Sequence, residues 1–185
     1  TAKDQKIYFT GGHGEGDLNQ VDGDGFSILK GRLREMNIEV IDGLTVQDGV
    51  PEDAGILAVL SPQARFSPAE VEAIRRHLQQ GRSALFLLDP GPMTGLEGLL
   101  DDYSVELGQD FVVDLSGIGQ MMGADVSVPV VLNYARHPVT EKVSQGMMSF
   151  FPWARSVSPT AHRTLNPEIE KLLFTHQSSW AEKDL

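Results

Sequence analysis

The chain has 185 residues, enough for one α/β domain with a full hydrophobic core and a small extension. Apolar residues (41%) and charged residues (22%) occur in ordinary globular proportions, which argues against a disordered chain. The net charge of −11 disfavours binding to nucleic acid or to an anionic membrane surface, and the absence of cysteine excludes disulfides, thiolate catalysis and cysteine zinc sites.

No apolar run approaches the roughly 18 residues that a membrane span needs. The chain begins with Thr1 rather than methionine. We therefore expect it to be an excised piece of a longer protein, so that missing anchors carry no information.

Five apolar segments are expected as β-strands: residues 6–10, 38–41, 56–60, 84–88 and 111–114. The third and fourth are continuous apolar runs, which are typical of strands buried on both faces of a parallel sheet. Between the first two, Phe26, Leu29, Leu33 and Met36 recur at helical spacing, with Asp24 as the expected N-cap.

Ser67 and Glu70, with Pro68 between them, form the clearest local signal, a capping box with proline at the first helical position. A second capping box, residues 94–97, opens a short helix before the fifth strand. Strands and helices therefore alternate, which predicts an α/β fold with a doubly wound, mainly parallel sheet. We expect a flavodoxin-like or amidotransferase-like sheet with strand order 2-1-3-4-5.

The last third of the chain reads differently. Residues 116–123 are expected as a loop, residues 126–134 as a β-prone stretch interrupted by Pro129, and residues 172–175 as a last strand. We predict one domain over residues 1–185, in which residues 1–115 form the parallel sheet and the β-rich residues 116–185 form an extension packed on it.

A glycine-rich loop, residues 11–17, follows the first strand. It lacks the lysine of a phosphate-binding loop, and Glu15 and Asp17 would repel phosphate. A dinucleotide fingerprint with Asp42 as the ribose ligand has the wrong spacing. The loop is therefore a tight turn, or it borders a pocket for a neutral or polyhydroxyl ligand that His13 and Glu15 contact. No cofactor is expected.

Nucleophiles and metal ligands are poorly represented. Ser61, with His137 and Glu141, could form a triad, but a serine before proline more often caps a turn. None of the five histidines has metal-ligand spacing, and we place His77 on the polar side of its helix. Asp89 and Asp114 end strands, where they could bind a divalent cation or cap the next turn. We predict no metal site.

An aromatic cluster, Phe150, Phe151 and Trp153, has two interpretations. It packs against the sheet as a satellite core, or it exposes Trp153 as a sugar-stacking platform or partner contact.

Several stretches, in order, resemble one known family. These are residues 6–15 (KIYFTGGHGE), 54–62 with the helix from Ser67 and the strand ending at Pro90, 96–114, 137–140 (HPVT), 151–156 (FPWARS), 172–175 (LLFT) and 179–182 (SWAE). Together they resemble the soluble domain of ABC-transporter auxiliary proteins similar to the gliding-motility component GldG, with related domains in an intraflagellar-transport protein. The resemblance covers nearly the whole chain.

The resemblance implies a non-catalytic, extracytoplasmic domain, anchored to the membrane by flanking segments and working beside an ABC permease and ATPase. It also implies a carbohydrate-binding role, without ligand residues that can be transferred. From the residues alone, we predict His13, Glu15, Asp89, His137 and Trp153 as contacts for a small polar ligand. The alternatives are a degenerate or unrecognised hydrolase of glutamine-amidotransferase-like fold and a cytoplasmic nucleotide-binding module.

Overall fold

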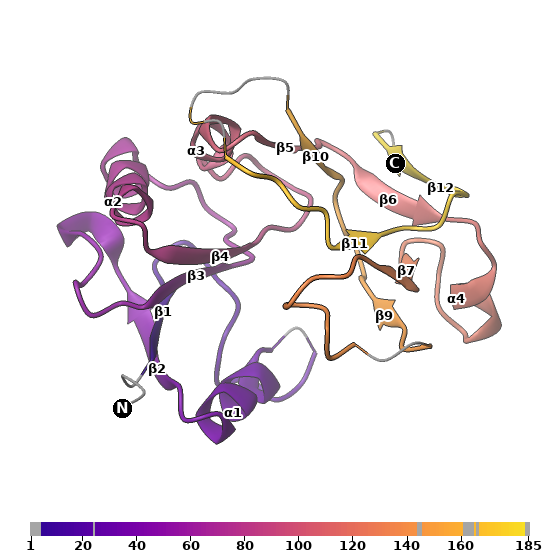
Figure 1. The fold of residues 1–185 in the computed structure, drawn as a ribbon, viewed down its shortest axis with the longest axis horizontal. Helices are drawn as coiled ribbons and strands as arrows, with labels where there is room; N and C mark the ends of the chain where they lie inside the picture. Colours follow the sequence, from indigo (N-terminus) through magenta and orange to yellow (C-terminus); the bar gives the residue numbers. More distant parts are fainter. Residues whose placement is uncertain (1–4, 24, 144–145, 161–164, 166, 184–185) are drawn as a thin grey trace. The chain divides into compact units, whose positions relative to one another are not determined.

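The computed structural model describes residues 5–23, 25–143, 146–160, 165 and 167–183. The chain divides into two compact units, Thr1–Leu99 and Leu100–Leu185 (Figure 1). The packing of residues 116–185 on the parallel sheet stays a prediction.

The first unit contains a four-stranded parallel sheet in the order β2-β1-β3-β4 (Figure 1). Its strands are β1 (Lys6–Thr10), β2 (Glu39–Leu44), β3 (Ile56–Leu60) and β4 (Ser83–Leu87). Strands β1 and β3 begin and end where the sequence predicts. The chain moves outward from β1 to β2 in one direction and from β3 to β4 in the other, so the sheet has a topological switch point between β1 and β3.

Two helices cross over this sheet, α1 (Ser27–Glu35) and α2 (Pro68–Gln79), with a short 3-10 turn η1 (Val46–Asp48) before β3. Because parallel crossovers are right-handed, the opposite directions of the two connections place the helices on opposite faces. The α1 face buries Ile7, Phe9 and Ala58 against half-buried Leu29 and Leu33. Met36, predicted on that apolar face, is exposed instead, and Asp24 lies outside the described residues.

Strand β4 differs from the prediction of a strand buried on both faces. Leu85 and Leu87 are exposed, whereas Ala84 and Phe86 between them are half-buried. Strand β3 is buried along four of its five residues because it lies inside the sheet, while β4 lies at the edge. A continuous apolar run therefore did not distinguish an edge strand from a central one.

The second unit is built from short antiparallel pairs. Helix α3 (Glu97–Asp102) spans the division between the units, and the pairs are β5 (Val105–Leu107) with β10 (Val157–Pro159), β6 (Phe111–Asp114) with β12 (Ser179–Glu182), β7 (Val130–Val131) with β9 (Ser149–Phe150), and β8 (Asn133–Tyr134) with β11 (Leu173–Phe174). The predicted loop at residues 116–123 includes one helical turn, α4 (Ile118–Met121).

The fifth predicted strand was assigned to the wrong sheet. Residues 111–114 do form a strand, β6, but it pairs antiparallel with β12 rather than extending the parallel sheet. A four-residue segment with three apolar residues carries no information about its partner strand, which here comes from the far end of the chain. The confirmed fold is a mixed α/β structure with a four-stranded parallel sheet and additional antiparallel strands, and the flavodoxin-like five-stranded order is not confirmed.

Candidate functional site

The switch point of the first unit is where open α/β sheets usually bind a ligand. Here the loop after β1 and the loop after β3 are joined there by backbone hydrogen bonds. Gly16 N donates to Leu60 O (3.0 Å), and Gln63 N and Ala64 N both donate to His13 O (2.8 Å each). The glycine-rich loop is therefore hydrogen-bonded at His13 and Gly16 to the end of β3 and the loop that follows it.

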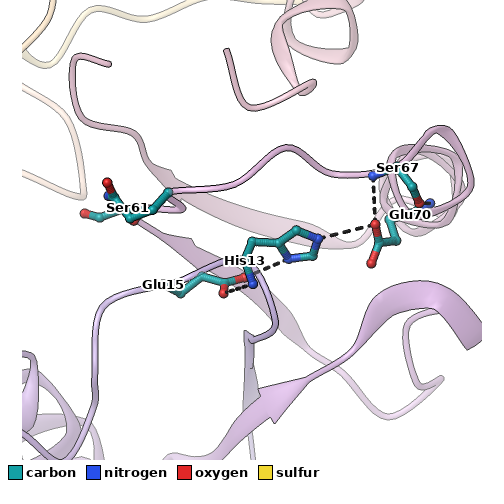
Figure 2. Close-up of polar contacts among 6 residues, drawn as sticks. His13, Glu15, Ser61, Ser67 and Glu70 are labelled. Carbon is teal, nitrogen blue, oxygen red and sulfur yellow. Dashed lines mark hydrogen bonds and ion pairs between the residues drawn. The ribbon is translucent and has the colours of Figure 1, made fainter. Parts of the chain in front are cut away.

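The imidazole of His13 lies between two carboxylates (Figure 2). Its Nδ1 is 3.2 Å from Glu15 Oε1, and its Nε2 is 3.3 Å from Glu70 Oε2. The ring also stacks on Phe66, with centroids 3.8 Å apart, and His13 is only 7% exposed. Ionised carboxylates only accept hydrogen bonds, so both contacts are satisfied together when the imidazole carries both protons.

Glu70 links this cluster to helix α2. Its Oε2 accepts the backbone N–H of Ser67 (2.7 Å), and Ser67 Oγ accepts the backbone N–H of Glu70 (3.4 Å), which is the predicted capping box (Figure 2). Burial opposes ionisation of this carboxyl, but the hydrogen bonds from Ser67 and the contact with His13 outweigh it and hold its pKa below the usual value. One carboxylate thus caps the helix and receives the histidine.

A groove with a volume of about 540 Å³ opens on the outer side of this cluster. Phe66, Ser67 and Glu70 form part of its wall, and Arg65 and Arg75 line it as well. His13 and Glu15 do not line the groove. His13 contacts two residues that do, Phe66 and Glu70.

Ser61 follows β3 directly and has a left-handed backbone, with φ of 48°. It lies apart from the imidazole in Figure 2. The two histidines of the described first unit are engaged elsewhere: His13 with its two carboxylates, and His77 Nε2 with Ser83 O (3.1 Å). His77 is buried rather than on a polar side of its helix, which corrects the sequence interpretation.

The two strand-end aspartates lie in different surroundings. Asp114 is buried, and its carboxylate accepts the N–H groups of Ser116 (2.8 Å) and Val130 (3.1 Å), so it caps the turn after β6. Asp89 is exposed in the segment after β4. Within the described residues, no group of three or more histidine, aspartate or glutamate side chains could hold a metal ion.

The two remaining predicted contacts belong to the second unit. His137 Nδ1 accepts the N–H of Val139 (3.1 Å), and its Nε2 is 3.7 Å from Glu170 Oε2. Trp153 is 54% exposed, and its left-handed backbone (φ of 53°) is held by a hydrogen bond from its N–H to Ser127 O (3.0 Å). Its indole lies against the ring of Phe111, with centroids 6.1 Å apart.

Trp180 borders the same face of the β6–β12 ribbon as Trp153. It lies opposite Val113, and Glu182 lies opposite Phe111, so these four side chains share one face. Trp180 is 43% exposed, and its Nε1 donates to Glu182 Oε2 (3.2 Å). We call Trp153, Trp180 and Glu182 the tryptophan platform. The sequence pointed to Trp153 alone, because nothing local indicates that residues 179–182 pair with β6.

Comparison with known structures places the fold among those of mixed α/β domains. The solved structure "mmIFT52 N-terminal domain" has a similar fold, with a TM-score of 0.74 and 18% sequence identity. The matched region covers 94% of this chain and 74% of that chain. That likeness concerns the fold alone.

The sequence itself gives the family. A family model described as "ABC-type uncharacterized transport system" matches residues 4–185, and the chain therefore belongs to this family of transport auxiliary proteins. No curated protein matches the chain. In the described part of the chain, no helix is both long and apolar enough to cross a membrane.

Proposed function

We propose that this chain is a non-catalytic binding domain of an ABC transport system, held on the extracytoplasmic side of the membrane beside the permease and ATPase subunits. Its family membership supports the transport context. The switch-point cluster supports a non-catalytic role, because the imidazole of His13 is engaged with Glu15 and Glu70, and neither His13 nor Glu15 lines the groove beside this cluster.

The ligand class that we propose is carbohydrate, and the tryptophan platform is the observation that carries this proposal. Trp153 and Trp180 stand on either side of β6, because Val112 N donates to Ala154 O (2.7 Å) along one edge and β12 pairs along the other. Two strand spacings put the indoles on the order of 10 Å apart. Flat apolar rings beside a carboxylate suit the alternating C–H and hydroxyl surface of a glycan.

Tryptophan fluorescence tests this proposal directly, because both tryptophans of the chain belong to the platform. The chain would be titrated with cellohexaose, maltohexaose and chitohexaose. We expect saturable emission changes with at least one of them, and calorimetry should find two- to tenfold weaker binding for Trp153→Ala and for Trp180→Ala, which corresponds to about 0.5–1.5 kcal/mol per ring.

Phe150→Ala is the matched control, because Phe150 is another exposed aromatic residue of the second unit and lies on β9, which pairs with β7 rather than with β6 or β12. It should bind as the unaltered chain does. If none of the three hexasaccharides binds, or if both tryptophan variants bind unchanged, the carbohydrate assignment is wrong.

The groove beside α2 is a second place for a polar ligand in this proposal. Arg65, Ser67 and Glu70 offer donors and acceptors to hydroxyl groups there, and His13 and Glu15 would act by fixing Glu70. Asp89 and His137 remain predicted contacts. Loss of binding in Arg65→Ala, without a change in thermal stability, would assign the glycan to this groove instead of the platform.

The transport context has its own test. In the full-length protein, a reporter fused at the end of this segment should be accessible from outside the inner membrane, and permease and ATPase subunits should copurify with it. A cytoplasmic reporter would overturn the extracytoplasmic location without affecting the carbohydrate test.

One observation favours a hydrolase as a second candidate. Ser61 has a left-handed backbone at the carboxyl end of an inner strand, as serine nucleophiles on sharp strand-to-helix turns do. A fluorophosphonate probe should label Ser61 if it is activated, and Ser61→Ala should abolish the label. Absence of labelling in the unaltered chain would remove the hydrolase.

A further inference from the structure

The second unit contains a cavity with a volume of about 520 Å³ that none of the functions above uses. It lies between residues 154–158 and residues 171–175, and Val112 and Val131 form part of its wall. Its size falls within the roughly 300–1,000 Å³ of small-molecule sites in proteins.

The lining of this cavity is mainly apolar. Phe151, Leu173 and Phe174 line it together with the two valines. Leu173 and Phe174 are 43% and 40% exposed, although they form a β-strand. These side chains therefore expose apolar surface to water, and a bound apolar group would cover that surface.

Both charged residues that line the cavity are cations. Arg155 is buried, and its Nε and Nη2 donate to Gly108 O (2.9 and 2.6 Å), while Lys171 is exposed. No described lining residue is acidic. The whole chain has a net charge of −11, whereas the charged residues that line this cavity are positive, and this favours an anionic ligand.

We propose that this cavity binds an amphipathic carboxylate, a molecule with an unbranched apolar chain that lies against Leu173 and Phe174 and a carboxylate that reaches Lys171. A single ammonium group suits a monoanion better than a phosphate dianion, because Arg155 already uses two of its donors on Gly108. The cavity and the tryptophan platform are on opposite sides of β6, because Val112 alternates with Phe111 and Val113.

Calorimetric titration of the complete 185-residue chain with decanoate, below its micellar concentration, tests the proposal. We expect saturable binding with one site per chain. Decanol, which lacks the charge, and acetate, which lacks the chain, should each bind at least about three times more weakly.

Two pairs of variants locate the site. Lys171→Ala should weaken decanoate binding about three- to fivefold, while Lys142→Ala, at another exposed lysine of this unit, should not. Leu173→Ala should weaken it by a similar factor, while Leu132→Ala should not, because Leu132 is equally exposed (46%) but lines a neighbouring cavity instead. All four side chains are exposed, so each variant should fold, which melting curves would check.

Several outcomes would overturn the proposal: no binding of decanoate, decanol binding as tightly as decanoate, non-saturable uptake, or unchanged affinity in both Lys171→Ala and Leu173→Ala. None of these results bears on carbohydrate binding at the other side of β6, so the two proposals fail separately.

Discussion

His13 Nε2 lies 3.3 Å from Glu70 Oε2, and this contact joins the loop after β1 to the first turn of α2. The residues are 57 positions apart in the sequence and both are buried. Because Glu15 contacts the other ring nitrogen, the imidazole lies between two carboxyl groups. At the switch point of this sheet, a polar cluster thus links the loop after β1 to helix α2.

Replacing His13 by alanine should destabilise the first unit by about 2–4 kcal/mol. The variant loses the stacking on Phe66 and leaves the side chains of Glu15 and Glu70 without the imidazole that contacts both. Urea denaturation measures the change. His176→Ala, at an exposed histidine of the second unit, is the control and should stay within about 0.5 kcal/mol of the unaltered chain.

Glu70→Gln should remove part of the acid sensitivity of folding. Since the pKa of Glu70 in the folded state is below its ordinary value of 4.5, its ionised form stabilises the fold above that pH. This stabilisation is lost as the pH falls through the lower folded pKa. The variant should be less stable by about 1–2 kcal/mol at pH 7, and the difference should shrink toward pH 3.

Glu72→Gln is the matched control for that experiment. Glu72 lies on the same helix, but its carboxylate is exposed and pairs with Arg75 (3.4 Å). Denaturation curves between pH 7 and pH 3 should be nearly parallel for this variant and the unaltered chain. Equal slopes for Glu70→Gln and Glu72→Gln would contradict the role of Glu70.

His77 should produce a second pH dependence, in a higher range. Burial lowers its pKa below the ordinary 6.5, and the charge of Arg82 acts in the same direction, against the hydrogen bond to Ser83. The contribution of neutral His77 to the stability of the fold is therefore fully present above about pH 6.5, and it is lost as the pH falls toward the lowered pKa. In His77→Gln, unfolding free energies between pH 7 and pH 5 should vary less than in the unaltered chain, and NMR titration of the ring should confirm the lowered pKa.

Local signals in the sequence predicted the local structure. Ser67, Pro68 and Glu70 form the expected capping box, and β1 and β3 have the expected bounds. The predictions that failed depend on distant partners. Whether Leu85 is covered depends on the position of β4 at the sheet edge, and whether His77 is buried depends on Ser83 and the sheet below it.

The candidate sites follow the same rule. The glycine loop identified His13 and Glu15, but Glu70 was interpreted only as a helix cap, because its second role requires the two loops to meet at the switch point. Trp153 was identified from its aromatic neighbours. Trp180 was not, because the β6–β12 pairing joins segments about 70 residues apart, and no periodicity in either segment encodes that register.

A substitution in the glycine loop tests whether Gly11 is needed for close backbone packing or for binding a ligand. A Cβ added to Gly11 would lie 2.8 Å from the backbone Cα of Gly43, where β1 and β2 approach each other. Backbone atoms cannot move aside cheaply, and Gly11 N also donates to Leu44 O (3.0 Å). Gly11→Ala should therefore lower the free energy of unfolding by about 1–3 kcal/mol.

Gly31→Ala, in the same unit, should instead raise the free energy of unfolding. Gly31 lies in helix α1, and an added Cβ would meet nothing within 4 Å. Alanine is the better helix former, so this variant should gain up to about 1 kcal/mol. Thermal melting compares the two substitutions, which add the same methyl group. If Gly11→Ala melts at or above the temperature of the unaltered chain, close packing of β1 against β2 does not explain that glycine, and a role in binding becomes the better explanation.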